Sequence, residues 1–304
     1  MKSPLTNSFN VSLEEEITCQ SIIDAYDNDY NIDVREYFKG VDFVKIYKCL
    51  DTGYRFYFPF SIVGKSQLYE ELQKRSGYYK LRLEHQVAEA FFKANDSVLE
   101  IGCGNGFFLK KLQQQGLSCT GLEFNEDAIK DGQDQSIRIL KQDIIEHAKT
   151  HYGHYDVVCS FQVLEHITEI HDFIRASIES LKTGGKYIIG VPNNNPFLYR
   201  YDKYHTLNLP PHHMGLWDKQ SLKNLQKYFN IRLDNLLIEP LQIYDYEYYF
   251  KIQIQHLKCQ SIFIGNIAEM MLLSMRSTKI RLKLQRIISR FVQGRNLLAV
   301  YTKL

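Results

Sequence analysis

Three alternating glycines, set between a short apolar run and a helix-like segment, constrain the fold of this chain more than any other feature. Residues 98–101 read Val-Leu-Glu-Ile, and Gly102, Gly104 and Gly106 follow before Phe107 resumes the apolar pattern. Glycine permits positive φ angles, and it lets a ligand approach the backbone because it has no Cβ. The pattern therefore predicts a strand, a tight glycine loop and a helix start, as in α/β folds that bind ligands beyond the carboxyl ends of parallel strands.

The spacing of these glycines separates two classes of nucleotide-binding protein. A dinucleotide fingerprint has its third glycine three positions after the second. In this chain that position is Phe107, and the third glycine comes one residue earlier. The spacing therefore argues against a nicotinamide-dependent oxidoreductase.

Four further apolar runs follow the glycine loop at the spacing of a parallel β/α repeat. They cover residues 119–123, 137–140, 155–160 and 181–193, the last comprising a helix end, a Gly-Gly turn and a strand. Glu123 closes the first of these runs, and Asp143 comes shortly after the second. A carboxylate about 20 residues beyond a glycine loop can accept two hydrogen bonds from a ribose diol. Glu123 is therefore a candidate ribose ligand.

The order of these segments resembles that of the class I S-adenosylmethionine (SAM) methyltransferases. The stretch from Glu100 to Gly106 is similar to the first motif of that family. Residues 161–166, Phe-Gln-Val-Leu-Glu-His, resemble the segment after the fourth strand in many small-molecule methyltransferases, including quinone O-methyltransferases. The resemblance implies a Rossmann-like α/β sheet of seven strands with an antiparallel last pair, and SAM as the cofactor.

The same resemblance implies roles for individual residues. Gly102 and Gly104 would leave room for the methionine part of SAM, and Glu100 would orient its amino group. Glu123 would hold the ribose, and Asp143 would accept a hydrogen bond from the adenine amino group. The full candidate set is Glu100, Gly102, Cys103, Gly104, Gly106, Glu123, Phe124, Asp143, Ile144, Phe161 and Gln162. The alternative for each residue is a plain structural role at the end of a strand.

Three histidines are the candidate catalytic bases. His212 and His213 stand in a Pro-Pro-His-His segment after the fifth strand, where substrate loops lie in this fold, and His166 follows the fourth strand. An imidazole can accept a proton from a hydroxyl acceptor near neutral pH. The alternatives are that His212 and His213 cap a helix beginning near Trp217, and that His166 is architectural.

Two segments are expected outside the nucleotide-binding core. The sequence predicts that residues 1–80 form an N-terminal extension, with a short helix and with a β-hairpin cap formed by residues 42–60. Residues 81–304 predict the SAM-dependent methyltransferase domain, with a helical insertion at about 243–294 between the last two strands. We expect no metal site, because Cys19 and Cys49 are lone cysteines and a structural zinc needs four ligands.

Composition limits the partners of the chain. A net charge of +2 gives no bulk attraction to nucleic acid. Scattered cysteines without a C-x-x-C pair fit a reducing cytoplasm. The polar first 20 residues do not resemble a signal peptide, and no apolar run approaches the about 18 residues needed to span a bilayer. Residues 270–295 fit either a basic amphipathic helix on an anionic membrane surface or an ordinary helix with a solvated basic face.

These observations give one hypothesis and one alternative. The hypothesis is a cytoplasmic SAM-dependent methyltransferase that acts on a small molecule or a glycan, at oxygen rather than carbon or nitrogen. A lipid-linked acceptor would follow if residues 270–295 contact a membrane. The alternative is a non-catalytic binding or scaffold protein with the same fold.

Overall fold

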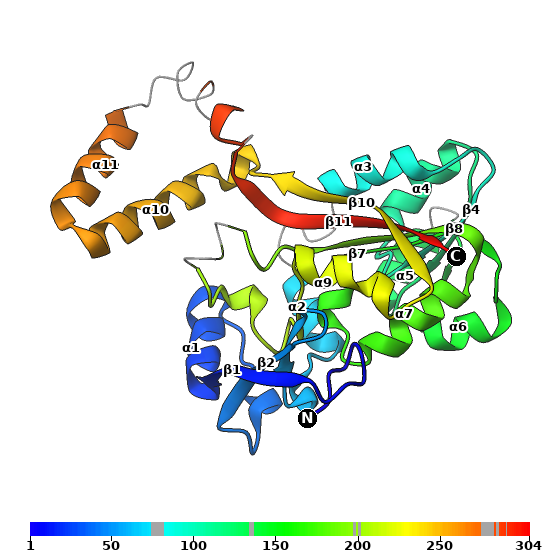
Figure 1. The fold of residues 1–304 in the computed structure, drawn as a ribbon, viewed down its shortest axis with the longest axis horizontal. Helices are drawn as coiled ribbons and strands as arrows, with labels where there is room; N and C mark the ends of the chain where they lie inside the picture. The colour runs from blue at the N-terminus through cyan, green and yellow to red at the C-terminus, as the bar shows by residue number, and fades with distance from the viewer. Residues whose placement is uncertain are drawn as a thin grey trace.

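The computed structural model describes residues 1–73, 82–133, 137–196, 199, 202–274, 283, 286–289 and 291–304. Within them the chain forms one sheet of seven strands and one of four (Figure 1). The strands of the larger sheet are β4 (Ser97–Ile101), β5 (Ser118–Leu122), β6 (Ile139–Leu140), β7 (Tyr155–Phe161), β8 (Leu181–Pro192), β10 (Ile231–Pro240) and β11 (Gln293–Lys303).

The larger sheet has the strand order β10-β11-β8-β7-β4-β5-β6. Strands β4 to β8 pair in parallel, whereas β11 lies between β8 and β10 and is antiparallel to both. The parallel strands therefore end at one common edge, where ligand sites of such sheets lie. The expected Rossmann-like sheet with an antiparallel last pair is confirmed.

Helices connect the strands and cover the larger sheet (Figure 1). They are α3 (Leu83–Ala88), α4 (Phe107–Gln114), α5 (Glu126–Gln133), α6 (Ile144–Thr150), α7 (Ile170–Glu179) and α9 (Lys219–Asn224). In α7, Ile170, Phe173, Ile174 and Ile178 recur at helical spacing and are buried. This apolar stripe attaches the helix to the sheet, because burial of such a face supplies most helix stability in a folded protein.

The smaller sheet joins the N-terminal region to a distant segment of the chain. Its strands, in the order β1-β2-β3-β9, are β1 (Val11–Thr18), β2 (Phe43–Cys49), β3 (Arg55–Phe58) and β9 (Gly215–Leu216). Helices α1 (Cys19–Tyr30) and α2 (Ser66–Gln73) flank it (Figure 1). The β2–β3 hairpin lies within the expected range 42–60. Strand β1 was not predicted, because the acidic run 14–16 interrupts apolar alternation there.

The fifth parallel strand begins earlier than the sequence suggested. We expected a helix end near Leu181, but α7 ends at Glu179 and β8 starts at Leu181. The Gly-Gly turn lies inside β8, where Gly184 has a φ of +79° and the pairing with β7 shifts register. A glycine with positive φ accommodates this irregularity without ending the strand.

The insertion between the last two strands is helical, as expected. Helices α10 (Tyr246–Gln260) and α11 (Ile262–Ser274) extend away from the larger sheet as an arm (Figure 1). Within the basic segment expected over residues 270–295, residues 275–282, 284, 285 and 290 lie outside the described residues, as does the expected domain boundary at residues 80 and 81. Among the described residues, no helix has both the length and the apolar character needed to cross a bilayer.

Candidate active site

The glycine loop between β4 and α4 requires glycine for its backbone shape. Gly102, Gly104 and Gly106 have φ angles of +71°, +55° and +72°, in the left-handed region that other residues rarely adopt. The amide of Gly102 donates to the carbonyl oxygen of Leu122, 2.8 Å away, which ties the loop to β5. A Cβ at Gly102 would overlap the side chain of Val163, so the loop also packs closely against the segment after β7.

The carboxylate of Glu123 lies directly against this loop. Its Oε2 accepts from the amide of Gly104 at 2.8 Å, and its Oε1 accepts from the amides of Phe124 and Asn125 at 2.8 and 3.0 Å. These charge-assisted bonds fix the position of the carboxylate at the end of β5. An ionised carboxylate has about four acceptor positions, so room remains for a hydroxyl donor.

Glu100 lies in β4 below the loop and is almost fully buried. Its side chain is 3% exposed, and among the described residues its Oε2 has no hydrogen-bond partner. Burial, together with the nearby charge of Glu123, holds the pKa of Glu100 well above its ordinary value. A buried polar atom without a partner beside an open backbone loop fits a site that is completed by a ligand with donor groups.

The segment after β7 carries a polar network that the sequence did not predict. Gln162 has a φ of +58°, which is uncommon for a residue other than glycine and concentrates at functional sites. Its side-chain amide donates to Glu84 Oε1 at 2.9 Å, and Asn296 donates to Glu239 Oε2 at 2.9 Å. Burial raises the pKa of Glu84 to about 7 and that of Glu239 to about 7. These residues are too far apart in the sequence for a motif to link them.

Several predicted cofactor residues have evident structural roles. The side chains of Cys103, Ile144 and Phe161 are buried in the hydrophobic core, so only their backbones can face a ligand. Asp143 is the N-cap of α6, and its Oδ1 accepts from the amide of Glu146 at 2.8 Å. Two further predicted residues differ in their surroundings. Gly106 packs against Ile137 and Ile139, and Phe124 is exposed beside Glu123.

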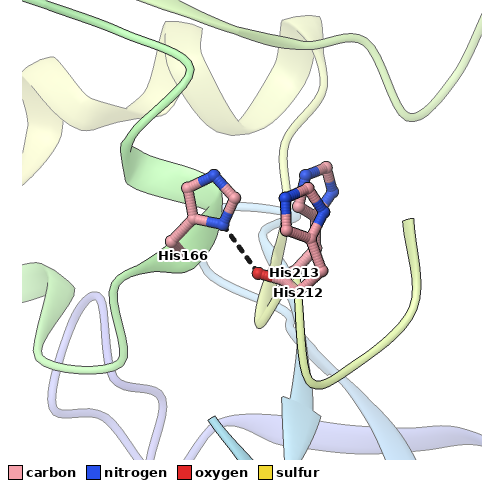
Figure 2. Close-up of side chains that lie close together, drawn as sticks. All are labelled: His166, His212 and His213. Carbon is pink, nitrogen blue, oxygen red and sulfur yellow. Dashed lines mark hydrogen bonds between the residues drawn. The ribbon is translucent and has the colours of Figure 1, made fainter. Parts of the chain in front are cut away.

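The three candidate bases, far apart in the sequence, converge in space. His166 lies in the 3-10 turn Leu164–His166 after β7, and His212 and His213 lie in the loop that leads into β9. Figure 2 shows the three rings facing one another across these two segments. The ring centroid of His166 lies 4.7 Å from that of His212 and 5.0 Å from that of His213. The rings of His212 and His213 are stacked, with their centroids 4.5 Å apart.

The hydrogen bonds of these rings define their tautomers. The Nδ1 of His166 lies 2.6 Å from the carbonyl oxygen of His212, and the Nδ1 of His212 lies 2.9 Å from that of Leu207. The Nδ1 of His213 lies 3.1 Å from Asn208 Oδ1. Carbonyl oxygens only accept, so each Nδ1 carries the hydrogen and each Nε2 carries a lone pair. Neutral rings in this state are acceptors at Nε2.

Burial keeps the three rings neutral. It lowers the pKa of His166 to about 4 and that of His212 to about 3, and it lowers the pKa of His213 well below the ordinary value. The alternative that His212 and His213 cap a helix is wrong, because Asp218 is the N-cap of α9 and its Oδ1 accepts from the amide of Ser221 at 2.7 Å.

The histidine cluster and the glycine loop lie at the same edge of the larger sheet. Val163, which packs against Gly102, is three residues before His166. The loop bearing His212 and His213 is held there by a hydrogen bond from the amide of Met214 to the carbonyl oxygen of Glu165, 2.7 Å long. The site therefore combines a loop with open backbone, a fixed carboxylate and neutral imidazole acceptors.

Comparisons with known proteins agree with this arrangement. Residues 73–235 match the model of a methyltransferase domain family. The ubiquinone biosynthesis O-methyltransferase of Sodalis glossinidius (strain morsitans) is 29% identical over 124 residues, covering 38% of this chain and 49% of the relative. That of Escherichia coli O157:H7 (strain EC4115 / EHEC) is 28% identical over 121 residues, covering 38% and 50%. The chain therefore matches about half the length of these curated relatives.

A solved structure shares the fold. A SAM dependent methyltransferase from Archaeoglobus fulgidus aligns with 79% of this chain and 100% of its own, with a TM-score of 0.50 and 20% identity. Together with the family match, this likeness confirms the expected fold and the expected resemblance.

Proposed function

The chain belongs to the methyltransferase domain family, and from this premise we propose that it transfers a methyl group from SAM to a hydroxyl oxygen of a small-molecule acceptor. The observation that carries the proposal is the contact between Glu123 and the glycine loop. A carboxylate fixed 2.8 Å from the amide of Gly104 joins the two strand ends that would hold the two halves of the cofactor.

The residues at this edge divide the work of cofactor binding. The backbone at Gly102 and Gly104 gives the methionine part of the cofactor close access. The acceptor position left on Glu123 would take one ribose hydroxyl, and the second hydroxyl would bind if one of the three amides gave up its bond to the carboxylate. The buried oxygen of Glu100 is an acceptor for the amino group, and Asp143 is an acceptor for the adenine edge.

The reaction needs placement more than it needs acid or base strength. SAM, when bound, supplies an electrophilic methyl group on a cationic sulfur that is a good leaving group. The protein must hold the acceptor oxygen in line with that methyl group, within about 3–3.5 Å, and such positioning can lower a barrier by about 7–11 kcal/mol. The Nε2 atoms of His166, His212 and His213 can accept a hydrogen bond from the acceptor hydroxyl and so orient it.

The acceptor class rests on the curated relatives and on the histidine cluster. The relatives named above are O-methyltransferases of ubiquinone biosynthesis. A hydroxyl group is a suitable substrate for this site, because it can donate a hydrogen bond to an imidazole nitrogen. We also retain the division into an extension, residues 1–80, and a methyltransferase domain, residues 81–304, as part of the proposal. A glycan or lipid-linked acceptor and a contact between residues 270–295 and a membrane stay predictions from the sequence.

Titration calorimetry with S-adenosylhomocysteine tests the cofactor assignment. Glu123→Ala should weaken binding by about 1–3 kcal/mol, the cost of losing hydrogen bonds to a charged acceptor. Glu126→Ala is the matched control, since Glu126 is an exposed glutamate three residues later that pairs with Lys141, and it should bind as the wild type does. Equal affinity in folded Glu123→Ala protein would refute the ribose assignment.

The same titration separates the enzyme from the scaffold alternative. A non-catalytic scaffold would show no saturable binding of SAM or S-adenosylhomocysteine. If binding is saturable, incubation with SAM carrying a labelled methyl group and a panel of phenols and catechols should transfer the label to oxygen, as read by mass spectrometry. Label found only on nitrogen or carbon would contradict the hydroxyl acceptor.

A further inference from the structure

Three neutral imidazoles converge at this site, which is more than a general base requires. One acceptor nitrogen suffices to take a proton from a hydroxyl group. Here one ring nitrogen from each of His166, His212 and His213 lies within 4.8 Å of the others, in a setting where His212 and His213 are buried. Among the described residues, the Nε2 of His212 has no hydrogen-bond partner. A buried lone pair without a donor is costly unless a ligand fills the position.

We propose that His166, His212 and His213 together bind one divalent transition-metal ion, with Zn²⁺ as the reference ion, through the Nε2 atom of each ring. The proposal goes beyond the methyl transfer proposed above, because metal binding depends on these three rings and not on SAM. It also revises the expectation from the sequence that the chain has no metal site.

The donor set selects the kind of ion. Neutral imidazole suits Zn²⁺, Cu²⁺, Ni²⁺ and Fe²⁺, whereas Mg²⁺ and Ca²⁺ prefer oxygen ligands. Three histidines are a known ligand set for zinc with a further position left for water or substrate. Zn–N bonds of about 2.0–2.1 Å place tetrahedral nitrogens about 3.3 Å apart. One ring nitrogen of each histidine lies within 4.8 Å of the others, so the donor atoms would have to come closer together when the metal binds.

The surroundings of the rings resemble the outer shell of a metal site. A histidine ligand usually donates its other ring nitrogen to a carbonyl or carboxylate oxygen, which fixes the ring and its tautomer. Each of the three histidines does this here through Nδ1, to the carbonyl of His212, the carbonyl of Leu207 and the side chain of Asn208. The same bond recurs in all three rings, which leaves Nε2 as the candidate donor atom of each, although the His166 ring also makes a hydrogen bond with the backbone of Gln162.

A buried carboxylate lies beside the cluster. Glu165 is 1% exposed, and its Oε1 lies 3.9 Å from the Nε2 of His166. Among the described residues, Glu165 Oε2 has no hydrogen-bond partner. Burial raises the pKa of Glu165 to about 8 in the ligand-free site, and a bound dication would favour the ionised form of this neighbouring carboxyl group.

Three protein ligands leave a tetrahedral ion with one more position, which an oxygen ligand can fill. A hydroxyl group bound there would have a lowered pKa, as metal-bound water does. That use of the metal rests on the proposed function, whereas binding of the metal itself does not. Metal titration and SAM titration are separate experiments, so failure of one proposal leaves the other testable.

Cobalt titration of the full chain tests the site directly. After treatment with a chelator and its removal, the protein is titrated with Co²⁺, whose visible absorption reports coordination number. We expect one equivalent to bind with the intense absorption of a four- or five-coordinate ion, and Zn²⁺ to displace it. No saturable Co²⁺ absorption and no Zn²⁺ binding by calorimetry in the wild-type protein would overturn the proposal.

Single substitutions assign the ligands. His212→Gln and His213→Gln should each weaken Co²⁺ binding by more than about 100-fold, beyond the about 10–100-fold loss typical of an outer-shell partner. His171→Gln is the matched control, because His171 also donates from Nδ1 to a carbonyl oxygen, that of Leu5 at 2.9 Å, but lies outside the cluster. Wild-type affinity in either cluster variant would overturn the assignment.

X-ray absorption of the Zn²⁺-loaded wild-type protein decides the question even if these variants fail to fold. We expect a first shell of nitrogen and oxygen atoms with the outer scattering of three imidazoles. A shell that contains sulfur would place the ion at a cysteine instead, and a shell of water oxygens would indicate an adventitious ion only. Either result would overturn the proposal.

Discussion

Glu84 illustrates how a single buried acid at a functional site can lower the stability of the folded protein. It is buried, and its Oε1 accepts from the amide of Gln162 at 2.9 Å, while among the described residues its Oε2 has no partner. Burial is the main reason that its pKa rises from 4.5 to about 7, with Glu239 adding repulsion and Arg82 opposing it. The fold therefore tolerates a buried acid with a raised pKa beside Gln162, which is characteristic of ligand sites rather than of cores.

The raised pKa of Glu84 predicts a pH-dependent cost in stability. Between about pH 4.5 and pH 7 the folded protein binds more protons at Glu84 than the unfolded chain does, so the free energy of unfolding falls as the pH rises. Glu84→Gln removes this titration. The variant should gain stability over the wild type across that window, by up to about 3 kcal/mol at neutral pH.

Urea unfolding of the ligand-free protein at about pH 5, 6, 7 and 8, which spans the titration of Glu84, measures this effect. Glu169→Gln, which removes an exposed carboxylate in the turn before α7, controls for the loss of one charge. A difference between Glu84→Gln and the wild type that stays constant from pH 5 to pH 8 would show that Glu84 does not titrate in this window.

At the scale of elements, the strand–loop–helix unit from β4 to α4 was predictable and its neighbours were less so. The glycine loop could be recognised because positive φ angles at Gly102, Gly104 and Gly106 demand that residue type. Glu123 could be placed because a residue that ends one parallel strand lies beside the loop that ends the next. Both inferences need only local sequence and sheet geometry.

Other elements depended on contacts that the sequence does not display. Strand β9 has two residues and exists because Arg55 and Phe56 of β3 pair with it, and a run that short has no periodicity to detect. The bond between Gln162 and Glu84 joins residues 78 positions apart. His166, His212 and His213 were singled out as separate candidate bases, but their convergence follows from the tertiary fold alone.

The glycine loop supports a prediction for the whole β4–α4 element. Gly104→Val adds a branched side chain where the cofactor would approach, and it should abolish binding of S-adenosylhomocysteine. Gly116→Val is the matched control: Gly116 follows α4, has a φ of +86° and has open space around an added Cβ. Both variants carry the cost of a left-handed non-glycine residue, about 1–2 kcal/mol, so both should lose similar stability in urea unfolding.

Only Gly104→Val should lose binding in calorimetry. Binding that survives in a folded Gly104→Val protein would mean that the ligand does not approach this loop. Loss of binding in Gly116→Val as well would indicate a general disturbance of the element instead of a blocked site.

At the scale of the whole molecule, the smaller sheet is tied to the edge of the larger sheet that holds the site. Tyr26 and Tyr57 donate from their hydroxyls to the carbonyl oxygens of Leu209 and Asn208. These bonds hold the loop that carries His212 and His213 against α1 and β3. The N-terminal region is therefore part of the site's construction, and its strands cannot be understood as an independent appendage.

The contact between β3 and β9 offers a test of this coupling. Tyr54, which precedes β3, is buried with its ring 4.4 Å from that of Trp217. A Cβ at Gly215 would overlap the hydroxyl oxygen of Tyr54, and the next nearest atom, Tyr54 Cζ, would lie at 3.1 Å. Gly215→Ala should therefore destabilise the protein by about 1–3 kcal/mol, the usual cost of overpacking a buried site.

Removal of that hydroxyl should relieve the overlap, so Gly215→Ala should cost clearly less in the Tyr54→Phe background than in the wild type. Urea unfolding of the two single variants and the double variant gives this coupling energy. Additive losses would show that the clash with Tyr54 is not the cause. Affinity for S-adenosylhomocysteine should stay near the wild-type value in Gly215→Ala, because the glycine loop and Glu123 lie on the larger sheet. Weaker Co²⁺ binding by the same variant would show that the substitution disturbs the loop that carries His212 and His213, because this loop continues directly into β9.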